Sequence, residues 1–195
     1  MNAIARPRRW LRLFMVLVGI GAVVFAIGGV LVRRADGPVL IFAGGPLRSG
    51  EPVALGDLDW TALDAKTELE LEIVGAGSSR TLWFSVHEGI PYVACDLDCA
   101  GGLLARWPQQ IERDDRVAVR IDGKRMEGRL VHVPHGTAEY AAVRAGRLQK
   151  YSGTGGARAA AEATAHNTVV EVGEVLTGRA ARDEPGDRLY RIDPR

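Results

Sequence analysis

The longest uncharged run in the chain lies close to its N-terminus. Residues 13–32 contain no charged side chain, and twenty residues of helix, at about 1.5 Å each, match a hydrocarbon core of roughly 30 Å. Four arginines precede this run and two follow it, so the positive-inside rule places the N-terminus in the cytoplasm. We therefore predict a single-pass anchor in the inner (cytoplasmic) membrane. The lipid bilayer is then its partner, and the C-terminal domain lies on the periplasmic or extracellular side.

A cleaved signal peptide is the alternative interpretation of the same run. The apolar core of a signal peptide has about 7–15 residues, and the run here is longer. The residues that follow it, Arg33-Arg34-Ala35, also differ from an A-x-A-like cleavage site. Length and flanking residues thus favour an anchor that stays attached to the mature chain.

Beyond the anchor, a stretch rich in glycine and proline gives way to alternating apolar and polar residues. Residues 33–63 are the Gly/Pro-rich stretch, and we expect this lead-in segment to space the following domain from the membrane. Residues 64–195 hold the regular pattern and form the predicted domain. Residues 1–12 form a basic cytoplasmic arm.

The pattern in the domain is mainly that of β-strands. Leu69, Leu71 and Ile73 alternate with glutamates, which is typical of a strand with one buried face. Periodicity and turn residues predict further strands over 81–87, 91–95, 116–121, 124–133, 168–176 and 189–192, and helices over 101–115 and 137–150. This order predicts an α+β fold, mainly β with helices, in which a small antiparallel barrel follows one transmembrane helix.

One hairpin is predicted together with its register. Asp122-Gly123 separates two strand patterns and is favoured in a two-residue type I′ turn, where both central residues take positive φ. Counting outward from this turn pairs Arg120 with Arg125 and Arg116 with Arg129, four residues that we name the arginine face. Like charges directly opposite each other destabilise a sheet. The arginine face therefore indicates either a bound anion such as phosphate or an ion-pair network with nearby acids.

Composition and charge narrow the classes of partner. The 195-residue chain has 25 Lys+Arg and 24 Asp+Glu, but six of the basic residues lie in residues 1–34, which hold no acid. The remainder is therefore mildly acidic, with 19 basic against 24 acidic residues. Nucleic-acid binding requires a basic footprint, so we do not expect nucleic acid as a partner of the domain.

The two cysteines are interpreted through the predicted compartment. Outside the cytoplasm, Cys95 and Cys99 are expected to form a disulfide that clamps a short loop. A zinc site that adds His132 and His135 is the weaker alternative, because the spacing matches known zinc motifs poorly. The chain carries no Walker-type loop, no G-x-S-x-G elbow and no dinucleotide fingerprint, which weighs against kinases, hydrolases and Rossmann dehydrogenases.

Part of the domain resembles a known superfamily. The stretch 107–119, with its Trp-Pro start and its Arg-Val strand, and the turn 74–80 resemble the flavin- and deazaflavin-binding split β-barrels. This superfamily includes pyridoxamine phosphate oxidase-like proteins and deazaflavin-dependent nitroreductases. The resemblance implies a homodimeric split barrel that binds FMN or a deazaflavin. It also implies a set of cofactor-binding residues, namely Ser79, Arg80, Trp107, Arg120 and Arg125.

Two functions from different classes follow. In the first, the protein is an anchored oxidoreductase in which Arg80 and Arg125 hold the cofactor phosphate and electrons pass to a quinone-like or nitro acceptor. In the second, the barrel binds no cofactor and is a non-catalytic binding or accessory module of the envelope. Gln110 and Asp114-Asp115, where the superfamily has Asn and Asn-Pro, motivate the second function. Trp107 is accordingly either a cofactor contact or a core residue.

Overall fold

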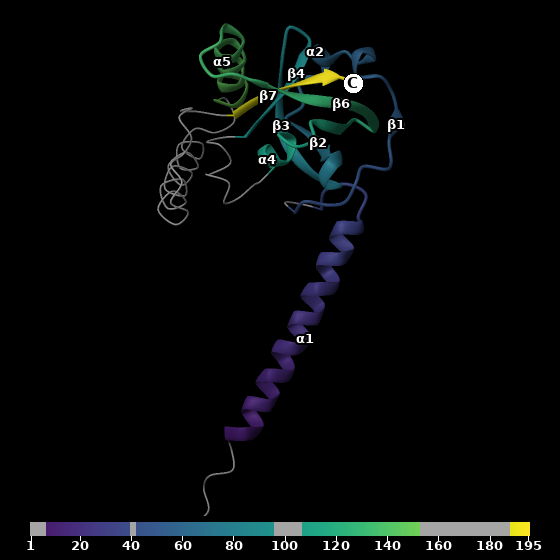
Figure 1. Ribbon diagram of the computed structural model, residues 1–195, viewed down its shortest axis with the longest axis vertical. Helices are drawn as coiled ribbons and strands as arrows, with labels where there is room; N and C mark the ends of the chain where they lie inside the picture. The colour runs from purple at the N-terminus through teal and green to yellow at the C-terminus, as the bar shows by residue number, and fades with distance from the viewer. Residues whose placement is uncertain (1–6, 40–41, 96–106, 153–187) are drawn as a thin grey trace, which may run out of the picture.

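The structure is a computed structural model that describes residues 7–39, 42–95, 107–152 and 188–195. One long helix, α1 (Pro7–Arg34), projects from the part of the molecule that holds the strands (Figure 1). Within the described residues, α1 is the one helix long and apolar enough to cross a membrane, over Leu13–Arg34. Its large apolar side chains are exposed, and Phe25 reaches 85% exposure, as expected of a surface that faces lipid.

The strands form one closed antiparallel barrel. Its wall consists of β2 (Glu68–Ile73), β3 (Ser78–His87), β4 (Ile90–Cys95), β5 (Arg116–Ile121), β6 (Lys124–Val133) and β7 (Arg188–Pro194). The strands lie in the order β6-β5-β2-β3-β4-β7, and pairing of β6 with β7 closes the ring. A two-residue strand, β1 (Glu51–Pro52), joins β6 in parallel. The predicted α+β fold with an antiparallel barrel and one N-terminal apolar helix is therefore confirmed.

The β5–β6 hairpin has the predicted turn and register. Asp122 and Gly123 form the turn with φ values of 54° and 74°. The four residues of the arginine face pair as counted outward from this turn. The β3–β4 hairpin turns at Glu88-Gly89, between the strands predicted over 81–87 and 91–95. Both hairpins form because their turn residues accept the positive φ that the right-handed twist of the strands requires.

Apolar side chains fill the barrel. Successive residues of a strand point to opposite faces, so each strand sends one set inward and the other outward. The apolar residues with 0% exposure come from four neighbouring strands: Leu71, Ile73, Phe84, Val93 and Val119. Removing such side chains from water is the main stabilising contribution in a small domain, so the barrel interior acts as a packed core.

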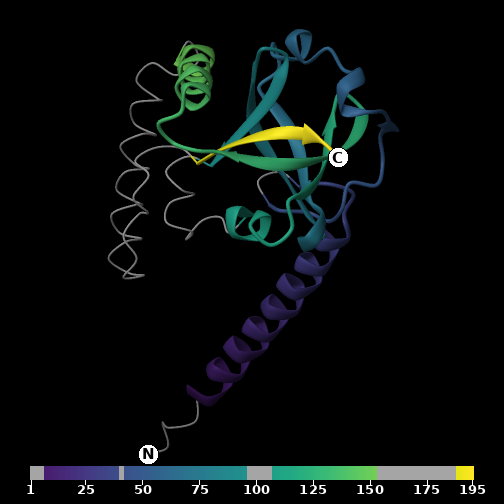
Figure 2. The same ribbon diagram turned by 45° about the horizontal axis from the view of Figure 1, so that its top comes forward.

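Two tryptophans extend this core from short helices. Trp60 begins α2 (Trp60–Leu63) and packs edge-on against Phe84, with ring centroids 6.2 Å apart. Trp107 begins α4 (Trp107–Ile111), is 2% exposed and packs against Tyr190, with ring centroids 5.1 Å apart. Figures 1 and 2 place the two helices toward opposite ends of the barrel. α4 lies within the helix predicted over 101–115, of which residues 101–106 are outside the described part.

The helix α5 (Ala138–Ser152) covers part of the outer wall. A second apolar cluster joins the helix to β4, β6 and β7, through Tyr92, Val133, Tyr140, Val143 and Leu189. The helix predicted over 137–150 is thus confirmed, and the strand predicted over 189–192 is β7. The strand predicted over 168–176 lies outside the described residues.

Candidate functional site

Part of the lead-in segment folds back along the outside of the barrel. Gly44 and Ser79 exchange backbone hydrogen bonds of 2.9 and 3.2 Å, which form a short bridge at the start of β3. The Ser79 hydroxyl donates to the carbonyl oxygen of Gly45 at 2.6 Å, and Ser79 is 0% exposed. Ser79, a predicted cofactor residue, therefore binds the chain's own backbone. This part of the lead-in segment rests against the barrel instead of standing free as a spacer.

A buried carboxylate fixes the next stretch of the lead-in segment. Glu72 lies opposite Ser79 in the sheet and is 6% exposed. Its Oε2 accepts a hydrogen bond from the backbone N–H of Leu47 at 2.8 Å, and Leu47 is itself 2% exposed. A buried charge requires hydrogen-bonding partners, so this contact ties the lead-in segment to β2.

Arg120, on the arginine face, is engaged by three residues of the same chain. Its Nη1 donates to the Asp36 carboxylate at 3.1 Å and to the Ser49 hydroxyl at 2.7 Å. Its Nη2 donates to the backbone carbonyl of Asp36 at 3.2 Å, and its Nε donates to the Glu70 carboxylate. The hydrogen bond to Glu70 is the main cause that raises the pKa of Arg120 above its ordinary value. We name these four residues, Asp36, Ser49, Glu70 and Arg120, the clamp.

The Asp36 carboxylate is the acid of the clamp with the most donors around it. It accepts hydrogen bonds from the backbone N–H groups of Arg48 at 2.6 Å and Ser49 at 3.2 Å, besides those from Arg120. The Ser49 side chain, followed by the Arg48 N–H, holds the pKa of Asp36 well below its usual range. Asp36 therefore remains an anion at any pH near neutrality.

We expect the clamp to weaken in acid. Because the pKa of Asp36 is lower in the folded than in the unfolded protein, its contribution is complete above about pH 4 and is lost as the pH falls below that value. The difference in free energy of unfolding between the native protein and Asp36→Asn should stay constant from about pH 7 to 5 and shrink below about pH 4. Urea titrations of the full chain in detergent micelles measure this difference. If the difference instead stays constant as the pH falls below about 4, the pKa of Asp36 is not lowered in the folded protein.

Three glycines allow the lead-in segment to turn tightly at the end of α1. Gly37 has a φ of +93°, which favours glycine. A Cβ at Gly44 would lie 1.7 Å from the carbonyl oxygen of Gly37, and a Cβ at Gly45 would lie 2.5 Å from the carbonyl oxygens of Arg33 and Ala35. The end of α1 and the returning segment thus meet backbone to backbone. The barrel consequently lies close to the end of the apolar helix (Figure 2).

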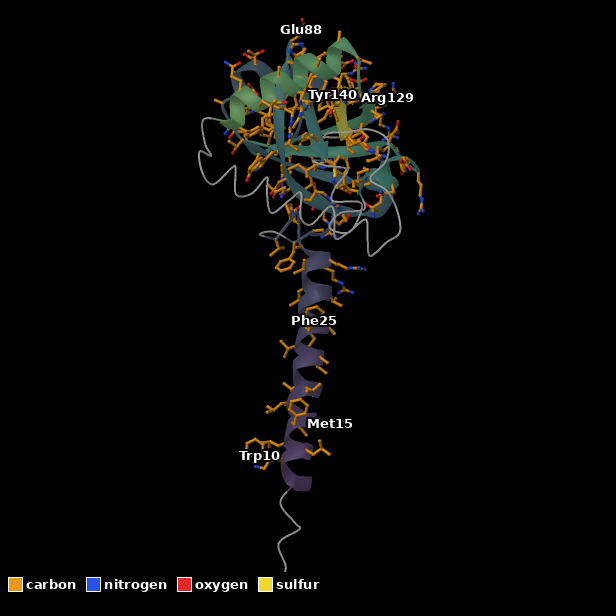
Figure 3. The ribbon with its side chains drawn as sticks, turned by 90° about the vertical axis from the view of Figure 1, so that its left-hand side faces the viewer. Trp10, Met15, Phe25, Glu88, Arg129 and Tyr140 are labelled. Atoms are coloured by element: carbon orange, nitrogen blue, oxygen red, sulfur yellow. The ribbon has the colours of Figure 1, made fainter. Side chains whose placement is uncertain are left out.

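The other residues of the arginine face have different surroundings. Arg116 forms an ion pair with Asp114 at 2.6 Å. The Nε of Arg125 is buried and finds no hydrogen-bond partner within the described part of the chain. Arg129 is exposed on the surface of the barrel (Figure 3). Acids therefore engage Arg116 and Arg120, as the ion-pair interpretation of the arginine face predicts.

Arg80 points to the inside of the barrel. It lies opposite Leu71, and residues directly opposite each other in an antiparallel pair share a face of the sheet. Desolvation lowers the pKa of Arg80, and its Nε has no hydrogen-bond partner among the residues that the structure describes. Arg125 lies opposite Arg120 on the outward face of β6. Arg80 and Arg125 thus lie on opposite faces of the barrel wall.

The five predicted cofactor residues do not converge on one surface of this chain. Ser79 and Arg120 hold the lead-in segment, Trp107 belongs to the core, and the remaining two arginines lie on opposite faces of the wall. A flavin or deazaflavin phosphate requires donors that point at it together. The arrangement within one chain does not fit such a group. No protein-family model and no curated protein matches this chain.

Two clefts flank the arginine face. One, of about 580 Å³, lies beside Arg120 and is lined by charged residues of both signs, including Lys66, Glu68 and Asp122. The other, of about 620 Å³, lies beside Arg125 and has a more apolar wall, formed by Val53 and its neighbours up to Gly56. The second cleft combines this apolar wall with the side chains of Arg125, Glu127 and Arg195, so its polar part carries charges of both signs.

Of the predicted cysteine and histidine ligands, Cys95, His132 and His135 lie in the described part of the chain. Cys95 ends β4 and is 4% exposed, but Cys99 lies outside the described residues, so the disulfide between them stays a prediction. His132 and His135 contact tyrosine rings, with ring centroids 5.6 and 4.9 Å apart. Across the described ranges, no group of three or more His, Cys, Asp or Glu side chains could hold a metal ion.

Proposed function

We propose that the protein is a membrane-anchored barrel that serves as a non-catalytic binding or accessory module at the membrane surface. The observation that supports this function is the engagement of Arg120 by two carboxylates and a hydroxyl of the same chain. A guanidinium group held in this way positions the lead-in segment and is not free for a cofactor phosphate. Within the arginine face, Arg120 then has a positional role, because it sets where the barrel sits relative to α1.

In this proposal the barrel lies next to the bilayer. α1 crosses the inner membrane with its N-terminus in the cytoplasm, and the charge bias around the apolar run supports that direction. The clamp holds the stretch that follows α1 against the outer wall, so the barrel does not swing on a long tether. Its clefts therefore stay within reach of membrane-borne partners or of a quinone-like small molecule.

A flavin- or deazaflavin-dependent oxidoreductase is the second candidate function. It is favoured by the buried Nε atoms of Arg80 and Arg125, each without a hydrogen-bond partner among the described residues. Buried donors of this kind suit an anion. The superfamily resemblance implies that the anion would be the phosphate of FMN or a deazaflavin in a homodimer. We rank this function second because the two arginines lie on opposite faces of the wall.

Spectroscopy of the purified full chain in detergent separates the two functions. We expect a colourless protein whose tryptophan fluorescence shows no saturable quenching when FMN or a deazaflavin is added. A bound chromophore would overturn the proposal in favour of the oxidoreductase. So would saturable quenching that Arg125→Ala abolishes and Arg129→Ala, the exposed control on the same strand, leaves intact.

A further inference from the structure

A large apolar side chain is exposed just beyond the end of α1. Phe42 is 60% exposed, the highest value for a large apolar residue among the described residues outside α1. Val39 and Phe42 exchange backbone hydrogen bonds of 3.1 and 3.0 Å, which form an isolated bridge between the two residues. An exposed phenyl ring in water costs free energy. Phe42 therefore calls for an apolar environment.

The position of Phe42 indicates which environment that is. α1 ends at Arg34, and the chain between Asp36 and Ser49 returns to the barrel under the hold of the clamp. Phe42 lies in the chain between these two fixed points, and the adjoining Gly44 and Gly45 meet the backbone of residues 33–38 at the end of α1. A helix that crosses the bilayer up to Arg34 brings Phe42 to the boundary between headgroups and acyl chains.

We propose that Phe42 packs into this boundary of the bilayer, as a second membrane contact beside α1. Apolar side chains such as Phe insert into the boundary between headgroups and acyl chains when they lie at the membrane surface, and the buried apolar area adds to the binding of the span. Arg33 and Arg34, in the last turn of α1, face the same layer and attract lipid phosphate groups. Two points of contact on one side of the membrane fix the tilt of the barrel as well as its height. The inference requires that α1 crosses the bilayer but not that the barrel lacks a cofactor.

Nitroxide accessibility in vesicles of phosphatidylcholine and phosphatidylglycerol tests this contact on the full chain. A nitroxide is attached through a genetically encoded ketone-bearing phenylalanine, which leaves both cysteines untouched and keeps an aromatic ring at position 42. Matched labels replace Phe25, in the middle of α1, and Glu88, at the end of the barrel far from α1 (Figure 3). Oxygen concentrates in lipid and a nickel chelate in water, so the ratio of the two accessibilities reports depth.

We expect the oxygen-to-nickel ratio at position 42 to exceed that at position 88 several-fold and to stay below that at position 25, as a site at the boundary requires. A ratio at 42 equal to that at 88, with a high ratio at 25, would overturn the membrane contact while leaving the anchor in place. Low ratios at both 25 and 42 would overturn the contact together with the span. Shielding of position 42 from both reagents, with dipolar broadening between labels, would assign Phe42 to a second copy of the chain and also overturn it.

Discussion

Replacing Trp107 by alanine should lower the free energy of unfolding by about 3–5 kcal/mol. The side chain is 2% exposed and packs against Tyr190, so its removal leaves a cavity in the core next to α4. This is the largest effect that we expect from a single predicted cofactor residue. Urea unfolding of the full chain in detergent micelles, followed by circular dichroism, measures it.

Trp83→Ala is the control for this substitution. Trp83 is 48% exposed and stacks on Tyr151 with ring centroids 5.1 Å apart, so its removal opens no comparable cavity. We expect a loss of about 1 kcal/mol from that variant. Equal losses from Trp107→Ala and Trp83→Ala would mean that Trp107 is not part of the packed core.

Arg120→Ala is expected to cost about 2 kcal/mol, the second largest effect. The substitution leaves the carboxylates of Glu70 and Asp36 without their shared cation. Both acids are partly exposed, with side-chain exposures of 31% and 36%, so water limits the loss to less than that of a fully buried pair. Hydrogen exchange of the full chain should also show faster exchange of the Leu47 amide, because the lead-in segment is released.

Arg129→Ala is the control on the same face of the barrel. Arg129 lies on the arginine face but is exposed, and a surface substitution of this kind changes stability by about 0.5 kcal/mol or less. A clamp role for Arg120 is contradicted if both variants behave alike. Unchanged exchange at the Leu47 amide in Arg120→Ala would contradict it as well.

Local patterns predicted much of the barrel. Asp122-Gly123 determined the turn of the β5–β6 hairpin, and counting from it paired Arg120 with Arg125 correctly. The alternation around Leu71 predicted β2, and the apolar run predicted α1. These features depend on residues close together in the sequence, and their physical causes are turn geometry and one buried face.

The clamp could not be predicted in the same way, because it depends on contacts between distant segments. β5 pairs with β2, its neighbour in the barrel wall although distant in sequence, which brings Glu70 opposite Arg120. Sequence order alone makes β3 the expected neighbour of β2. It gives no reason to place the glutamates of β2 beside the arginine face. Asp36 and Gly45 lie in a stretch whose turn signals predict a loop but do not show where that loop docks.

The one signal that pointed toward the clamp was the charge pattern itself. Arginines directly opposite each other destabilise a sheet unless an anion lies beside them, and the sequence left open whether the anion is a ligand or an acid of the chain. For Arg120 the acids are Glu70 and Asp36. Arg125, its partner across the hairpin, keeps a buried Nε without a hydrogen-bond partner in the described residues, and the cleft beside it is where we expect a binding partner.

A double-mutant cycle between Asp36 and Arg120 tests most directly whether the clamp holds the barrel on its anchor. The free energy of unfolding is measured for the native chain, Asp36→Ala, Arg120→Ala and the double variant, all in the same detergent at neutral pH. We predict a coupling energy of about 1 kcal/mol or more, because each substitution removes the partner of the other. Losses that add to within about 0.3 kcal/mol would show that the two residues act independently, and would contradict the clamp.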